Sequence, residues 1–299
     1  MDLHNLAVED PQKAQDALEI MQDMYDRQPD NIWTCRSDAK CYNTVMDGWI
    51  QAGRPDRAQV VLDEMERIAD MDVAAKFTED DGTVFAPGIL SYMMVAQGWA
   101  DDVKDDTTGR SAENAEAIMR RMSSRGIEPS VKIWSIVMEG WCKRAGKVRG
   151  VMRRAEALLK EMEDAAEAAP GNATRSRNAV HPNVLTYTSF IGGLSRSRES
   201  ELARKAEAVL DRMERFGVEP DMVAYTSVLN CWASAVSRRE RELAASRALN
   251  ILGLMERLYA KENYQVKPSL ITYATAIKAI GNSLDRNAPK IAEDVVKVR

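Results

Sequence analysis

The sequence is poor in the residues that build metal centres and disulfide frameworks. Its 299 residues include four cysteines and two histidines, and no two cysteines have the C-x-x-C spacing of a zinc or redox motif. A small, uncharged thiol packs well in an apolar core. We therefore expect Cys35, Cys41, Cys142 and Cys231 to be buried free thiols, and we expect no metal and no cofactor.

Long hydrophobic runs and an excess of positive charge are also missing. No run of about eighteen apolar residues occurs, so the sequence predicts no helix that spans a membrane. The formal net charge is −5, which argues mildly against a strongly basic nucleic-acid-binding protein. The first ten residues contain Asp2, Glu9 and Asp10 but no Lys or Arg, so no signal or transit peptide is visible.

Motifs diagnostic of a catalytic site are absent as well. The H-x-E and C-x-x-C pair of zinc deaminases does not occur. Residues 140–147 (GWCKRAGK) are similar to a phosphate-binding loop, but they have one residue too many and no Ser or Thr follows. The sequence therefore predicts a protein that is not an enzyme and has no small-molecule substrate.

What the sequence does contain is helical periodicity, most clearly in residues 42–65. An apolar stripe at i, i+3, i+4, i+7 and i+8 predicts a first helix, and Pro55 interrupts the pattern. A second apolar stripe then predicts a second helix. The two stripes consist of Tyr42, Val45, Met46, Trp49 and Ile50, and of Ala58, Val61, Leu62 and Met65. Two short amphipathic helices cannot bury their apolar faces alone, so this unit needs neighbours.

The same unit recurs along the chain. The second helix repeats an Ala followed seven residues later by Met: Ala17/Met24, Ala58/Met65, Ala115/Met122, Ala155/Met162, Ala206/Met213 and Ala248/Met255. The first helix repeats an aromatic residue with a small residue six positions later: Tyr42/Gly48, Tyr92/Gly98, Trp134/Gly140, Tyr187/Gly193, Tyr225/Cys231 and Tyr273/Ala279. Gly costs about 1 kcal/mol in a helix interior, so its recurrence predicts close helix crossings.

The shortest combination of these spacings is a unit of 35 residues, and longer copies contain insertions in loops. Residues 1–38 supply only a second helix, Ala17–Met24, without its partner, and the chain stops inside another unit. Both ends therefore look cut, and we expect a fragment of a longer array.

A 35-residue helix pair that begins YNTVMDGWIQAGR resembles the pentatricopeptide repeat. The units also close with a Pro and a polar residue, at Pro129–Ser130, Pro182–Asn183, Pro220–Asp221 and Pro268–Ser269. Tetratricopeptide repeats are the nearest alternative, but they place the Trp before the Tyr, and here the order is reversed. The resemblance implies an all-α, right-handed superhelical solenoid formed by one array over residues 1–299. Its parts would be a partial repeat at 1–38, repeats at about 39–88, 89–130, 131–183, 184–221 and 222–269, and a truncated repeat at 270–299.

The resemblance also implies a function. Proteins of this family bind single-stranded RNA, one base per repeat, with the amino-terminal repeats toward the 5′ end. It implies a mitochondrial or plastid location and a role in the processing, stability or translation of RNA. Single-stranded RNA is the expected partner, other RNA-processing proteins are further candidates, and no membrane is expected.

Two residues of each repeat are expected to read the base: the residue after the aromatic and the residue after the closing Pro. The first lies about 100° around the helix from the apolar stripe, so it is expected to face out of the packed layer. By resemblance, Thr188 with Asp221 reads guanine, Ser135 with Asn183 adenine, Thr226 with Ser269 a purine and Asn43 with Gly88 a pyrimidine. Met93 with Ser130, and Ala274, match no good pair.

A third residue, two positions before the aromatic, is expected to pack on the base face. It is aliphatic in four repeats, as Leu90, Leu185, Val223 and Ile271. Clustered cations are candidates for phosphate contacts: Lys132, Lys143, Arg144, Lys147 and Arg196.

A second reading stays open. The negative net charge and the unreadable Met93 and Ala274 also fit a tetratricopeptide-like scaffold that binds a protein partner. The predicted base-reading residues could instead serve only as helix-start or solvent-facing residues. Such a purely structural role would favour the protein-binding scaffold.

Overall fold

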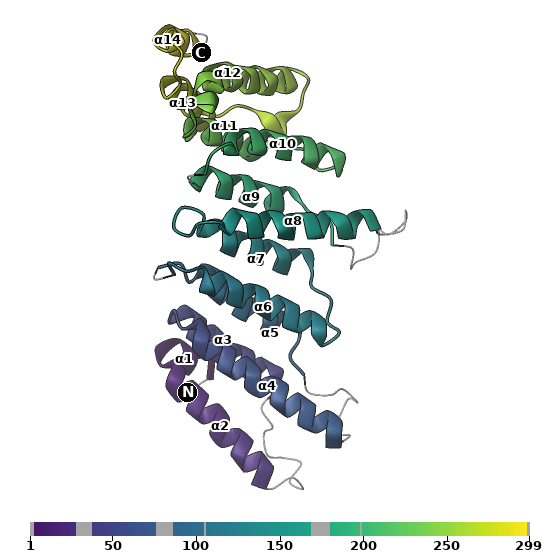
Figure 1. The fold of residues 1–299 in the computed structure, drawn as a ribbon. Helices are drawn as coiled ribbons and strands as arrows, with labels where there is room; N and C mark the ends of the chain where they lie inside the picture. Colours follow the sequence, from purple (N-terminus) through teal and green to yellow (C-terminus); the bar gives the residue numbers. More distant parts are fainter. Residues whose placement is uncertain are drawn as a thin grey trace. The chain divides into compact units, whose positions relative to one another are not determined.

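The computed structural model describes residues 3–27, 38–75, 86–104, 106–168, 180–197 and 199–297. It divides the chain into two compact units. The first consists of Met1–Asp106 and Arg110–Pro129, and the second of Thr107–Gly109 and Ser130–Arg299. All regular structure in the described ranges is helical, which confirms the predicted all-α class (Figure 1).

The first unit contains three helix pairs. They are α1 (Leu3–Glu9) with α2 (Pro11–Arg27), α3 (Ala39–Gln51) with α4 (Pro55–Ala75), and α5 (Ile89–Asp101) with α6 (Arg110–Ser124). The first helices α1, α3 and α5 pack side by side. The second helices α2 and α4 each also contact the first helix of the next pair.

The second unit contains four pairs built in the same way. They are α7 (Val131–Lys143) with α8 (Val151–Ala168), α9 (Val184–Arg196) with α10 (Leu202–Arg215), α11 (Met222–Ala233) with α12 (Arg238–Ala260), and α13 (Leu270–Gly281) with α14 (Ala288–Lys297). A short 3₁₀ helix, η2 (Tyr264–Val266), packs on α12.

Each unit therefore has two layers. Within a unit, consecutive first helices contact each other, and each second helix except the last packs on its own first helix and on the next one. This arrangement leaves one face of the first-helix layer without a covering helix. None of the helices in the described ranges is long and apolar enough to cross a lipid bilayer. The right-handed superhelix and the single array over the whole chain stay predictions.

The Ala–Met repeat forms the core between the layers. Five of the six predicted pairs are fully buried: Ala58/Met65, Ala115/Met122, Ala155/Met162, Ala206/Met213 and Ala248/Met255. An Ala admits a neighbouring helix closely, and the Met about two turns further fills the space beside it. This part of the prediction is confirmed.

The small residue of the first helix allows neighbouring first helices to approach. A Cβ atom on Gly48 would lie 2.4 Å from the carbonyl oxygen of Ala7, and one on Gly193 would lie 2.8 Å from the Sγ atom of Cys142. Because real Cβ atoms do not approach other atoms so closely, any larger residue would push the helices apart. The predicted packing reason for these glycines is confirmed.

The amino-terminal repeat was predicted in the wrong register. Ala14 is fully buried in α2, and Leu18 is buried beside it, whereas Ala17 is only half-buried. Pro11 begins α2 as Pro55 begins α4, and the buried Ala follows three residues later in both helices. Residues 1–38 also contain a partner for this second helix, because α1 contacts both α2 and α3.

A buried carboxylate ties consecutive repeats together. Glu66 at the end of one repeat's core accepts a 2.7 Å hydrogen bond from the hydroxyl of Tyr92 and pairs with Arg121. Burial, together with the hydrogen bond to Glu66, raises the pKa of Tyr92 above its ordinary value. The second unit repeats this arrangement with Glu163, Tyr187 and Arg212.

The prediction of buried free thiols is confirmed for two of the three described cysteines, Cys142 and Cys231. Cys41 is only half-buried, in contrast to the prediction. Burial raises the pKa of Cys142 to about 12. Cys35 lies outside the described residues.

Candidate nucleic-acid interface

The residue after the closing Pro is the N-cap of the next first helix in every described repeat boundary. Asn183 Oδ1 accepts a 2.9 Å hydrogen bond from the Thr186 backbone N–H, and Asp221 Oδ1 accepts one of 2.8 Å from Ala224. Ser269 caps α13 through the Thr272 N–H at 3.2 Å, and Gly88 caps α5 without a side chain. Capping fixes these side chains at the edge of the uncovered first-helix layer.

Large aliphatic side chains stand exposed two residues after these caps. Their exposed fractions are 58% for Leu90, 58% for Leu185, 51% for Val223 and 70% for Ile271. Single exposed apolar residues are common on proteins, but here the same helix position is exposed in four repeats. Lys132 occupies the equivalent position of α7 and is also exposed. The sequence therefore located a row of exposed side chains in the second unit and one such residue, Leu90, in the first.

The residues after the aromatics are more buried than predicted. Asn43, Thr188 and Thr226 are half-buried, and Ser135 has only 5% of its surface exposed. The expectation that Ser135 faces out of the packed layer is wrong. A position 100° from the core stripe faces the neighbouring first helix, because first helices pack side by side.

A hydroxyl of the next first helix holds three of these residues. Ser91 Oγ donates a 2.8 Å hydrogen bond to Asn43 Oδ1. The hydroxyls of Ser135 and Thr186 lie 3.0 Å apart, as do those of Thr226 and Thr272. Sequence reasoning missed the residue just before the aromatic, which supplies the second hydroxyl as Ser91, Thr186 and Thr272. Its signal was available, because a Thr three residues after a polar N-cap can complete a capping box, as Thr186 and Thr272 do.

The repeat of Thr188 differs in this contact. The equivalent residue of the next first helix is Ala224, which has no hydroxyl. The Thr188 hydroxyl instead donates to the carbonyl of Val184 in its own helix, at 2.8 Å. Thr188 and Asp221 are therefore positioned independently of each other.

The predicted phosphate contacts fall into two groups. Lys132, Lys147 and Arg196 are exposed, and Lys143 is half-buried with an ion pair of 3.0 Å to Glu139. Arg196 also donates to the backbone oxygen of Cys142 at the end of α7. These four cations lie on or directly after first helices.

Arg144 does not belong to this group. Its side chain is fully buried, and Nη1 donates a 2.6 Å hydrogen bond to the backbone oxygen of Gly140. The guanidinium satisfies the carboxyl end of α7, where helix carbonyls lack partners. The prediction of a phosphate contact for Arg144 is wrong.

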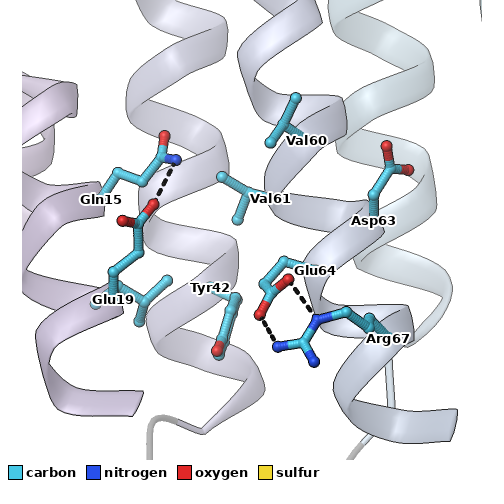
Figure 2. Close-up of a pocket in the computed structure, with 9 residues that line it drawn as sticks. Gln15, Glu19, Tyr42, Val60, Val61, Asp63, Glu64 and Arg67 are labelled. Carbon is cyan, nitrogen blue, oxygen red and sulfur yellow. Dashed lines mark hydrogen bonds and ion pairs between the residues drawn. The ribbon is translucent and has the colours of Figure 1, made fainter. Parts of the chain in front are cut away.

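A cavity of about 410 Å³ lies elsewhere, between α2, α3 and α4 (Figure 2). Its polar side chains satisfy one another, because Gln15 donates to Glu19 and Arg67 pairs with Glu64. Val60 and Val61 line it from α4, and Tyr42 lines it from α3. It contains none of the predicted base-reading residues, so the row on the first helices is the better candidate site.

Comparison with known proteins points to one family. A family profile described as the pentatricopeptide repeat domain matches residues 175–235 and 208–283, and one described as the PPR repeat matches residues 40–68. The chain is 22% identical over 197 residues to a pentatricopeptide repeat-containing protein of Arabidopsis thaliana, covering 66% of this chain and 28% of the relative. A second such protein from Arabidopsis thaliana, named as chloroplastic, is 23% identical over 196 residues, covering 66% of this chain and 20% of the relative. The chain thus spans less than a third of the length of these relatives.

The chain was also compared with solved structures. The chain is similar to the pentatricopeptide repeat protein PPR10 in complex with an 18-nt psaJ RNA element, with a TM-score of 0.49 and 21% identity, covering 95% of this chain and 32% of that chain. For the structure of PPR10 from maize the TM-score is 0.35 at 15% identity, covering 97% of this chain and 41% of that chain.

Proposed function

The chain belongs to the pentatricopeptide repeat family, and from this premise we propose that it binds single-stranded RNA on its first-helix layer without catalysing a reaction. One base is held by each repeat. The observation that carries the proposal is the exposed aliphatic residue that recurs two positions after the N-cap of a first helix, at Leu90, Leu185, Val223 and Ile271.

Each exposed aliphatic residue packs on the face of a base. A flat base and a branched side chain bury apolar surface on contact, and this contact accepts any base. Affinity from this row is therefore insensitive to sequence. Selectivity comes from the polar residues beside it, which meet the edge of the base.

Asp221 is suited to guanine. Its Oδ1 atom is occupied by the Ala224 N–H, so Oδ2 is the oxygen left to accept bonds from a ligand. The Watson–Crick edge of guanine presents two neighbouring donors, N1–H and N2–H₂, that a carboxylate oxygen can accept. Thr188 lies in the same repeat and completes the reading of this base.

Asn183 is suited to adenine. Its Oδ1 atom accepts from both the backbone N–H and the hydroxyl of Thr186, at 2.9 and 3.0 Å. This fixes the orientation of the amide, and its NH₂ group is left to donate. The N1 atom of adenine is an acceptor at the matching position of the base edge.

The remaining repeats contribute less selectivity. Thr226 with Ser269 fits a purine and Asn43 with Gly88 a pyrimidine, in line with the family pattern. Met93 and Ala274 offer no hydrogen-bonding group to a base edge. With amino-terminal repeats toward the 5′ end, the repeats at 131–183, 184–221 and 222–269 in the second unit favour the order adenine, guanine, purine.

Phosphate contacts come from Lys132, Lys143, Lys147 and Arg196. When these four cations neutralise phosphates, counterions leave the RNA, and the logarithm of the binding constant falls with the logarithm of the salt concentration with a slope of at most about −3 for a single strand. This is a modest value, in keeping with the net charge of −5. We further propose an organellar role in RNA processing, stability or translation, supported by the relative named as chloroplastic.

The proposal is tested by selecting RNA from a randomised ten-nucleotide pool with the purified chain and sequencing what is retained. The expected result is enrichment of adenine followed directly by guanine, with retention that falls as salt rises. Retention without any base enrichment, or a protein partner captured equally well after nuclease treatment, would favour the scaffold reading instead.

A further inference from the structure

We propose that Thr186 positions both base-reading residues of the repeat at 131–183 and sets the hydrogen-bonding polarity that they present. This inference rests on the proposed function, because it concerns how one base is chosen. Thr186 itself is fully buried, so it acts on the base only through Ser135 and Asn183.

The Thr186 hydroxyl lies between the two residues. Its Oγ1 atom is 3.0 Å from Ser135 Oγ on α7 and 3.0 Å from Asn183 Oδ1 at the start of α9. It also accepts from the backbone N–H of Asn183 at 3.4 Å. Ser135 and Asn183, which belong to different helix pairs, are thus joined through one buried oxygen.

The direction of these hydrogen bonds follows from the donors available. Asn183 places Oδ1 against the Thr186 N–H, and an oxygen there can only accept. The single proton of Thr186 must therefore point to Asn183 Oδ1. Since Thr186 has no further proton, the Ser135 hydroxyl has to donate its own proton to Thr186.

This proton order fixes what the pair offers to a base. Ser135 has given away its proton, so its oxygen can only accept from a ligand. Asn183 has its oxygen occupied, so its NH₂ group can only donate. An acceptor beside a donor matches the exocyclic amine and ring nitrogen of adenine or cytosine. The same pair disfavours guanine and uracil, because the Asn183 NH₂ group would meet the ring N–H of the base, and both groups are donors.

Other repeats of the same chain support this interpretation. Ser91 holds Asn43 in the first unit, and Thr272 lies 3.0 Å from Thr226 and 3.1 Å from Ser269 in the second. The repeats at 89–130 and 184–221 lack this hydroxyl, because Ile133 and Ala224 occupy the equivalent position. The hydroxyl therefore joins two base contacts in the repeats at 131–183 and 222–269, and it holds Asn43 alone in the repeat at 39–88.

The test compares Thr186→Val with Thr186→Ser in the RNA selection described above. Val keeps the shape but removes the hydroxyl, whereas Ser keeps the hydroxyl. We expect Thr186→Val to lower the preference for adenine over guanine at its position by about five- to tenfold, the value of one lost hydrogen bond. Enrichment of the neighbouring guanine should stay at the wild-type level, and Thr186→Ser should retain the adenine preference.

A general loss of structure would act differently, because it would lower retention of all RNAs and both base preferences together. Circular dichroism of each variant separates the two effects. If Thr186→Val does not fold, Ala224→Ser tests the same inference, because it adds the hydroxyl at the equivalent position of the neighbouring repeat. That variant should change base preference at the guanine position and leave the adenine position unaltered.

Two results would overturn the inference. The first is a folded Thr186→Val variant with the wild-type preference for adenine, and the second is an Ala224→Ser variant with no change at its own position. A wild-type chain that retains RNA without any base preference would instead contradict the proposed function itself, and the role of Thr186 would fall with it.

Discussion

The hydroxyl of Tyr187 donates a 2.9 Å hydrogen bond to Oε1 of Glu163, which belongs to the preceding repeat. Arg212 donates to both oxygens of the same carboxylate, at 3.1 and 2.6 Å. The three residues come from α8, α9 and α10. This buried carboxylate therefore fixes the step from one helix pair to the next, and with it the spacing of the exposed aliphatic row.

Loss of this carboxylate should destabilise the second unit. Glu163 is only 4% exposed, so Glu163→Gln leaves the Arg212 guanidinium without its counter-charge in a half-buried position. We expect a loss of about 1–2 kcal/mol in the free energy of unfolding, measured by urea titration. Glu167→Gln is the matched control, because its ion pair with Arg215 is largely exposed and should change stability by less than about 0.5 kcal/mol. Equal effects of the two substitutions would contradict this role of Glu163.

Stability should fall at alkaline pH. Burial is the main cause that raises the pKa of Tyr92 and Tyr187 above the ordinary value of 10.0. The hydrogen bond from Tyr92 to Glu66 and the one from Tyr187 to Glu163 raise it further. A raised pKa in the folded state means that the unfolded chain loses its proton first as pH increases. The stabilisation is therefore complete below pH 10 and declines above it. Urea titrations at pH 8 and pH 10.5 should show this decline, and it should be smaller in a Tyr92→Phe/Tyr187→Phe variant. An equal decline in that variant would assign the alkaline sensitivity to other groups.

Two adjacent glycines should respond in opposite directions to the same substitution. Gly193→Ala places a methyl group 2.8 Å from Cys142 Sγ and should destabilise the protein by about 1–3 kcal/mol. The nearest atom to a methyl group on Gly192 is the end of the Arg196 side chain at 3.7 Å. Gly192→Ala should therefore be neutral or stabilise the helix by up to about 1 kcal/mol. Thermal unfolding of both variants measures the difference, and similar melting temperatures would contradict the close helix crossing.

The buried thiols should be chemically inert in the folded protein. Burial raises the pKa of Cys142 to about 12, and it also raises the pKa of Cys231. Because only the thiolate reacts with alkylating reagents, neither residue should be modified at pH 8 without denaturant. Peptide mapping after iodoacetamide treatment checks this, with the same sample in urea as the positive control. Rapid native modification of Cys142 would show that α7 and α9 separate in solution.

The sequence was sufficient for the parts of the fold that depend on local periodicity. The Ala–Met spacing and the recurring glycine predicted the buried face of each helix, because both follow from helix geometry alone. The register of α2 was mistaken, since Ala14 and Ala17 both lie seven residues before a Met. The Ala–Met spacing alone does not distinguish them, whereas Ala14 follows Pro11 by three residues as Ala58 follows Pro55.

The site was predicted less completely, for a physical reason. Exposure of Leu185 or Ile271 follows from their place on one helix, whereas burial of Ser135 depends on the helix beside it. Arg144 shows the same limit, because a cation at the end of a helix can turn either to solvent or to the helix carbonyls. The contact of Thr186 joins two repeats, and a pattern read within one repeat does not contain it.

The central claim is that RNA binds the first-helix layer, and two valines of nearly equal exposure test it most directly. Val223 is 51% exposed at the start of a first helix, and Val60 is 49% exposed on the second helix α4. The affinity of a fluorescent RNA containing the selected sequence is measured by anisotropy for Val223→Ser and for Val60→Ser. Loss of one apolar contact with a base should weaken binding by Val223→Ser about three- to fivefold and leave Val60→Ser at the wild-type value. Unchanged affinity for Val223→Ser, or an equal loss in both variants, would contradict the account.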